Sequence, residues 1–111
     1  MSLANYCEPT VLLSAVTATG AGSSYSFQTD YTKTLPAMLV WETRNTSAAT
    51  LVVNLEGSMD NVNWYTVDTN NSTTNALKWV TDKPTRFIRA NLTTLSGAGA
   101  VVTVILHPFN D

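Results

Sequence analysis

Residues 50–56 read Thr-Leu-Val-Val-Asn-Leu-Glu, and this stretch decides the fold class. Leu51, Val53 and Leu55 recur at every second position, which is the spacing of a strand with one buried face. The turn formers Gly-Ser-Met-Asp-Asn-Val-Asn follow at once, and a second strand-like stretch begins at Trp64. This part of the chain therefore predicts an antiparallel hairpin.

The rest of the chain repeats this pattern of short strands and polar turns. Alternating or β-branched stretches are separated by clusters of Gly, Pro, Asn and Ser at spacings of about ten residues. No stretch has the periodicity and capping residues of a helix. The apolar run 37–41 predicts a strand covered on both faces, whereas 20–24 and 70–75 predict loops. We expect about eight short antiparallel strands, at residues 10–18, 25–28, 37–43, 50–56, 64–68, 76–80, 86–93 and 101–106.

The length of 111 residues fits one domain around a single core. With 44% apolar residues and a net charge of −2, the composition favours a folded chain over a disordered one. Together with the strand pattern, this predicts an all-β fold, a single-domain, jelly-roll-like β-sandwich. We place the sandwich at residues 10–107, an N-terminal arm at 1–9 and a C-terminal tail at 108–111.

The composition also excludes several classes of function. Thr, Asn and Ser number 18, 10 and 9, a third of the chain, while charged residues make up only 13%. Such a surface lacks the basic character of nucleic-acid-binding proteins, and no apolar run is long enough to span a membrane. The start, Met1–Pro9, lacks the basic and apolar regions of a signal peptide, and a single Cys forms no internal disulfide. We therefore expect a protein made in a cytoplasm and kept there, or assembled there into something larger.

The sequence offers no pattern for catalysis or metal binding. The single His, His107, has no nucleophile and orienting acid at a recognisable spacing, and Cys7 is far from it in sequence. One His and one Cys do not make a zinc site of the usual kind. The run 60–63 (Asp-Asn-Val-Asn) has the oxygen-rich spacing of a calcium loop but lacks its Gly and final Glu, so turn chemistry explains it. We expect no enzyme, no cofactor and no metal.

The tryptophans have two possible uses, core packing or stacking against a ligand. Trp41 lies in the most apolar strand, which places it in the core. Trp64 and Trp79, together with Tyr65, could instead form a platform for a sugar ring. Core packing is the simpler interpretation for Trp64 and Trp79, and ligand stacking is the alternative.

The second half of the chain resembles a known kind of protein. The hairpin Glu-Gly-Ser-Met-Asp…Trp of 56–64, followed by Arg-Phe-Ile-Arg-Ala at 86–90 and by Val-Val-Thr-Val at 101–104 after a Gly-Ala-Gly turn, resembles small β-domains of tailed-phage structural proteins. Among these it looks most like the capsid decoration (cement) proteins of short-tailed phages related to epsilon15. The resemblance covers about residues 50–106, half of the chain.

The residues that carry this resemblance have readable structural roles. We expect Gly57 to permit the turn, Asp60 and Asn61 to close it with hydrogen bonds from side chain to backbone, and Trp64 to seal the hairpin onto the core. Two arginines beside the following strand should pair with acids at its rim; they are Arg86 and Arg89, with Glu56 or Asp82 as partners.

The resemblance implies a structural virion protein with no active site. Such a jelly roll would sit on the exterior of an icosahedral capsid and clamp neighbouring subunits of the major capsid protein, stabilising the shell against internal DNA pressure. It implies a homo-oligomer, with a dimer favoured, and neither nucleic acid nor membrane as a partner. Leu3 and Tyr6 in the arm and Phe109 in the tail are candidate partner contacts. The alternative is a carbohydrate- or receptor-binding β-module of a phage tail or fibre.

Overall fold

The structure, a computed structural model, describes residues 9–27, 38–81, 83 and 85–109. These residues form nine strands and no helix. The strands are β1 (Thr10–Val16), β2 (Gly20–Ala21), β3 (Tyr25–Ser26), β4 (Met38–Thr46), β5 (Thr50–Ser58), β6 (Tyr65–Asn70), β7 (Ala76–Thr81), β8 (Phe87–Ser96) and β9 (Val101–Phe109).

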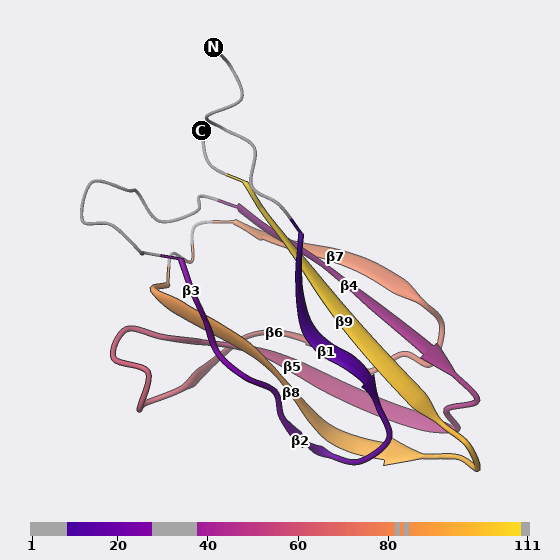
Figure 1. Ribbon diagram of the computed structural model, residues 1–111. Coiled ribbons are helices and arrows are strands. Elements are labelled where there is room, and N and C mark those ends of the chain that lie inside the picture. Colours follow the sequence, from indigo (N-terminus) through magenta and orange to yellow (C-terminus); the bar gives the residue numbers. More distant parts are fainter. Residues whose placement is uncertain (1–8, 28–37, 82, 84, 110–111) are drawn as a thin grey trace.

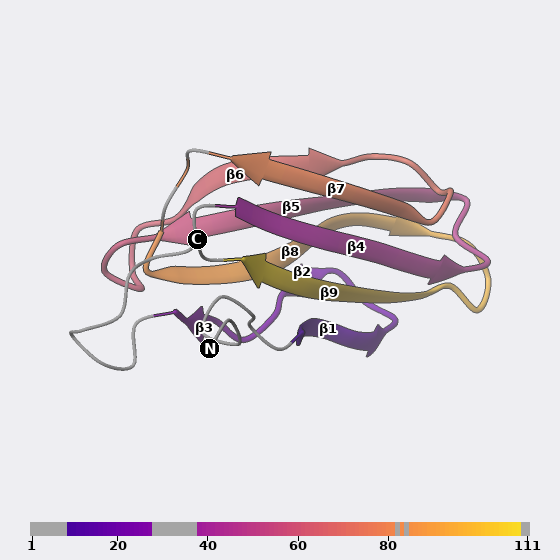
Figure 2. The ribbon, with the colours of Figure 1, turned by 90° about the horizontal axis from the view of Figure 1, so that it is seen from above.

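The strands pair antiparallel in two sheets, seen as two layers in Figure 1. The first sheet has the order β1-β9-β4-β7, and Figure 2 shows these strands side by side. The second sheet has the order β2-β8-β5-β6, and β3 also pairs with β8. β2 and β3 both pair with β8 and can be counted as one interrupted strand. The first strand of the chain, β1, then pairs with the last, β9, in one sheet, and the second, β2 with β3, pairs with the last but one, β8, in the other. This is the order of a jelly roll, so the predicted all-β, jelly-roll-like sandwich is confirmed.

The core lies between the two sheets and follows the alternation read from the sequence. Leu51, Val53 and Leu55 of β5 are at most 2% exposed. They are joined by alternate residues of the neighbouring strands, namely Ile88, Ala90 and Leu92 of β8, Val102, Val104 and Leu106 of β9, and Leu39 and Trp41 of β4. Trp41 therefore lies in the core, as predicted.

The strand β4 is covered less completely than its apolar sequence suggested. Leu39 and Trp41 face the core, whereas Met38 and Val40 face outward and are only partly buried. The expectation of cover on both faces is therefore wrong. The outward residues are shielded by the strands β9 and β7 on either side of β4, and no second layer is needed for that.

The glycine-rich stretch 20–24, expected to be a loop, contains the short strand β2. Gly20 and Ala21 pair with Leu92 and Asn91 of β8, and the backbone N–H of Gly22 donates to the carbonyl of Ala90 at 2.9 Å. At Gly22 a Cβ atom would collide with the backbone of β1. Glycine is used here to let the segment that follows β2 pass close to β1.

The last strand is longer than the sequence indicated. β9 continues to Phe109, with Pro108 opposite Leu39 and Phe109 opposite Met38. The backbone of the first two residues of the expected tail thus belongs to the sheet. Of the expected N-terminal arm, residues 1–8 lie outside the described part of the chain.

Candidate interaction surface

Two kinds of feature, metal-ligand clusters and membrane-spanning helices, are absent from the described residues. Within them, no three His, Cys, Asp or Glu side chains gather closely enough to hold a metal ion. The same residues contain no helix that could cross a membrane. His107 lies on the outer face of the first sheet, where its Nε2 atom is 3.7 Å from Oε1 of Glu42, and Glu42 also accepts a hydrogen bond from Nε of Arg44 at 2.7 Å. Glu42 thus contacts Arg44 along its own strand and His107 on the neighbouring strand; Cys7 lies outside the described residues.

The loop between β5 and β6 is closed by one carboxylate. Asp60 accepts hydrogen bonds from the backbone N–H groups of Val62 and Asn63 at 2.9 and 2.8 Å, and from the Asn63 amide at 2.7 Å. The backbone bonds from Asn63 and Val62, with the side-chain bonds of Asn63 and Ser58, hold the pKa of Asp60 well below its usual range. Asp60 therefore closes the turn as predicted, and its carboxylate oxygens accept hydrogen bonds from residues of the same loop.

Asn61 has a different role in this loop from the one expected. Its backbone has a φ of 63°, a left-handed conformation that Asn adopts more readily than most residues. Its backbone N–H donates to Oγ of Ser58 at 2.8 Å. Asn61 thus contributes through its backbone, and the expected side-chain bond is not among the contacts of this loop.

Gly57 lies within β5 and does not form the turn. A Cβ atom at this position would meet Oγ1 of Thr85 at 2.7 Å and Cγ2 of Val67 at 3.0 Å. Thr85 is buried and donates from this hydroxyl to the carbonyl of Ser58 at 3.0 Å. The predicted turn role is wrong, because glycine is needed here for the close approach of the segment that leads into β8.

The outer face of the second sheet is covered by its own polar side chains. Glu56 is only 9% exposed and accepts hydrogen bonds from Nε of Arg89 at 2.7 Å and from the amide of Asn91 at 3.1 Å. The guanidinium of Arg89 lies 4.2 Å from the centre of the Trp64 ring, within cation–π range. We call this group, Glu56, Trp64, Arg89 and Asn91, the sealed face.

The sealed face confirms one prediction and corrects another. Arg89 pairs with Glu56 as expected. Trp64 is half-buried and packs against Arg89 on the outside of the sheet, so its assignment to the core is wrong. Asp82 lies outside the described residues, so its pairing with Arg86 stays a prediction.

The outer face of the first sheet carries exposed apolar side chains at its β7 edge. Leu77 is 58% and Trp79 is 66% exposed. Trp79 lies opposite Val40, which in turn lies opposite His107, so the three side chains form one row across the sheet. We call Leu77, Trp79 and Val40 the open face. The prediction that Trp79 packs in the core is therefore wrong.

Trp41 and Trp79 show how one residue of register decides burial. Trp41 lies opposite Lys78, the neighbour of Trp79, and points to the core, where its indole N–H donates to Oδ2 of Asp68 at 2.9 Å. Trp79 is displaced by one residue and so points outward. The alternation Leu-Lys-Trp of β7 fits a strand in either orientation, so the sequence alone could not tell which side is exposed.

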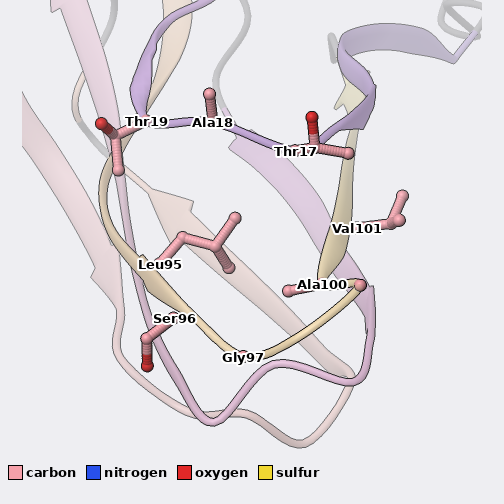
Figure 3. A pocket seen from close by; sticks show the side chains of 9 residues that line it. Thr17, Ala18, Thr19, Leu95, Ser96, Gly97, Ala100 and Val101 are labelled. Carbon is pink, nitrogen blue, oxygen red and sulfur yellow. The ribbon is translucent and has the colours of Figure 1, made fainter.

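Several hollows lie at the surface of the described part of the sandwich, and two of them have the same volume. The first, of 370 Å³, lies at one end and is lined by uncharged residues only; Figure 3 shows Leu95 pointing into it, opposite the segment Thr17–Thr19. The second, also of 370 Å³, adjoins the open face and is lined by Asp68, Leu77, Lys78 and Trp79. In this second hollow, Nζ of Lys78 is 3.9 Å from Oδ1 of Asp68. Of these two hollows, the second joins apolar surface to charged groups, as does a smaller hollow of 140 Å³ where Lys83 lies beside Met59 and Tyr65.

The predicted partner contacts fall mostly beyond the described residues. Leu3 and Tyr6 lie outside them. Phe109 is the last residue of β9, and its backbone pairs with Met38. The partner contacts of all three residues remain predictions, and the exposed apolar residues found in their place are Leu77 and Trp79.

The strand order and the packed sheets define the chain as a jelly-roll β-sandwich. No family model matches the chain, and no curated protein matches it either. Among solved structures, the chain is similar to the crystal structure of the SPBc2 prophage-derived protein YomS, with a TM-score of 0.68 over 91% of this chain and 91% of that chain. The two sequences are 7% identical, so this likeness shows the fold alone.

Proposed function

We propose that this chain is a structural protein of a tailed-phage particle. It binds the outer surface of the icosahedral capsid and clamps neighbouring subunits of the major capsid protein. The open face carries this proposal, because exposed Leu77 and Trp79 on a weakly charged domain are typical of a protein interface. The sequence resemblance to capsid decoration proteins and the prophage origin of YomS support the phage setting.

A clamp of this kind acts through binding energy and needs no chemistry. A protein that binds the assembled shell, but not its separated subunits, stabilises the shell in proportion to its occupancy. Many copies on one particle add their effects, even if each contact is weak. With a net charge of −2, binding should rest on apolar contacts and hydrogen bonds and should depend only weakly on salt.

The test compares phage particles with and without the chain. Particles from a phage whose gene for this chain is deleted should release their DNA at a lower temperature, or at a lower chelator concentration, than complete particles. Adding back the purified chain should restore their resistance. The proposal would be refuted if the two kinds of particle were equally resistant and mass spectrometry found no copy of the chain in wild-type virions.

The exposure of Trp79 also favours a second function, carbohydrate recognition by a tail or fibre module. Its indole ring adjoins a hollow that holds the Asp68 carboxylate and the Lys78 ammonium group, and an aromatic surface beside polar groups can bind a sugar ring. A glycan array separates this function from the first. Binding by the wild type that is lost in Trp79→Ala but kept in Tyr65→Ala would support the sugar site, and the lack of any bound glycan would eliminate it.

A further inference from the structure

Three of the four sheet edges in the described structure are irregular. The edge strand β1 has register shifts between Val11 and Leu13 and between Leu13 and Val16. The opposite sheet is bounded on one side by β2 and β3, with two residues each, and on the other by β6, whose pairing with β5 shifts between Leu55 and Glu56. Short strands and bulges of this kind prevent an edge from pairing with another chain.

The fourth edge, β7, has none of these protections. Ala76–Thr81 pairs with Met38–Thr43 of β4 through six consecutive residues without a shift. On its outward side this regular strand carries Leu77 and Trp79, at 58% and 66% exposure. A regular edge with alternating apolar residues is suited to the addition of another strand.

We propose that β7 pairs antiparallel with β7 of a second copy of this chain, so that two first sheets join into one across a two-fold axis. Opposite residues of an antiparallel pair point to the same side of the sheet. Outward residues must therefore meet outward residues, which are Leu77, Trp79 and Thr81. This leaves only a few possible registers.

Charge excludes one of these registers, and aromatic stacking favours another. If Lys78 lay opposite Lys78 of the second copy, two ammonium groups would face each other, and such like-charged pairs are unfavourable. If Trp79 lies opposite its own copy, Lys78 lies opposite Val80, and Leu77 lies opposite Thr81. Lys78 then keeps its contact with Asp68, 3.9 Å away within the same chain. The register centred on Trp79 also stacks two large aromatic side chains across the axis.

The same pattern favours a second copy over a foreign strand. Every outward residue of β7 finds an uncharged partner in the copy, so the strand is complementary to itself, as a two-fold interface requires. The paired area is small compared with stable dimer interfaces, so we expect a weak dimer, with a Kd of about 10 µM or higher. The interface forms without the capsid, so its failure in solution would leave the proposed capsid function untouched.

Sedimentation of the full chain over a wide concentration range tests the dimer. The wild type should pass from monomer to dimer as concentration rises, and Trp79→Lys should raise the Kd by about tenfold or more. Val62→Lys is the matched control, since Val62 is 75% exposed in the loop between β5 and β6, and it should leave the Kd unchanged. A wild type that stays monomeric, or a dimer that tolerates Trp79→Lys, would overturn the proposal.

Cross-linking tests the register while Trp79 is retained. In a Cys7→Ser background, the double variant Leu77→Cys/Thr81→Cys should form a covalent dimer on oxidation, because the two new thiols lie opposite each other across the axis. Each single variant should form no covalent dimer under the same conditions. Efficient cross-linking of either single variant, or none in the double variant, would overturn this register. Circular dichroism verifies that all variants fold.

Discussion

The two outer faces of this sandwich are built from similar strands but differ in how their side chains are covered. On the sealed face, Glu56, Arg89 and Asn91 bind one another, and Arg89 covers Trp64. On the open face, Leu77 and Trp79 stay exposed, although Glu42, which pairs with Arg44, lies directly opposite Leu77. One sheet thus satisfies its outer side chains internally, while the other leaves apolar surface uncovered.

This difference supports our proposal that the open face is the interaction surface of the molecule. Leu77 and Trp79 lie exposed on the same side of one edge strand and form the kind of apolar patch that binds a partner, so we place the proposed interface there. The sealed face needs no such partner. Substitutions on the sealed face should therefore change stability, and substitutions on the open face should change association.

The largest contrast is between two tryptophans on neighbouring strands. Trp41→Ala should lower the free energy of unfolding by about 3–5 kcal/mol, because it leaves a cavity and removes the hydrogen bond to Asp68. Trp79→Ala should change it by about 0.5 kcal/mol or less, since the side chain is largely in water. Urea unfolding at low protein concentration, where dimers are not populated, measures both. Similar losses in the two variants would contradict the assignment of inner and outer faces.

A smaller contrast separates the two glutamates that face outward. Glu56→Ala should lower the free energy of unfolding by about 1–3 kcal/mol, because it leaves Arg89 and Asn91 without their partly buried partner. The matched change Glu42→Ala breaks an exposed pair with Arg44 and should lower it by about 1 kcal/mol or less. Thermal unfolding of the two variants side by side measures both losses. A larger loss of stability in Glu42→Ala than in Glu56→Ala would contradict the prediction.

The contact between Trp64 and Arg89 should contribute less than the carboxylate does. Trp64→Leu keeps apolar cover on the sheet and removes the ring beneath the guanidinium, so we expect a loss of about 0.5–1 kcal/mol. Combining it with Arg89→Lys in a double-mutant cycle isolates the coupling between the two residues. Purely additive losses would show that the contact contributes nothing.

The smallest effect concerns pH and the loop between β5 and β6. The pKa of Asp60 is lower in the folded chain than in the unfolded one, so its stabilising effect is complete above the unfolded value of about 4 and disappears as pH falls toward the folded value. Asp60→Asn should therefore flatten the fall in stability below pH of about 4. NMR titration of the Asp60 carboxyl checks the cause directly, and a midpoint at the ordinary value for Asp would contradict it.

The core was predictable from the sequence because burial follows a period of two. Leu51, Val53 and Leu55 had to share one face, and the structure places them there. The partner of Glu56 was also predictable, since a charge within a strand needs a counter-charge nearby. These features depend on local pattern and on simple chemistry.

The open face was not predictable because it depends on strand order and register. The stretch 76–81 has apolar residues at both alternating sets of positions, and only its pairing with β4 decides that Trp79 faces water. Likewise, the role of Gly57 comes from Thr85, which is far along the chain. Contacts between distant segments determine both, and one sequence does not show them.

Binding of the purified chain to phage particles that lack it tests the central claim most directly. Co-sedimentation should be saturable, with a fixed number of copies per capsid subunit and little dependence on salt. Trp79→Lys should weaken it by about tenfold or more, while Val62→Lys should bind as the wild type does. If the wild-type chain fails to sediment with DNA-filled capsids, or sediments only with tails and fibres, it is not a capsid clamp.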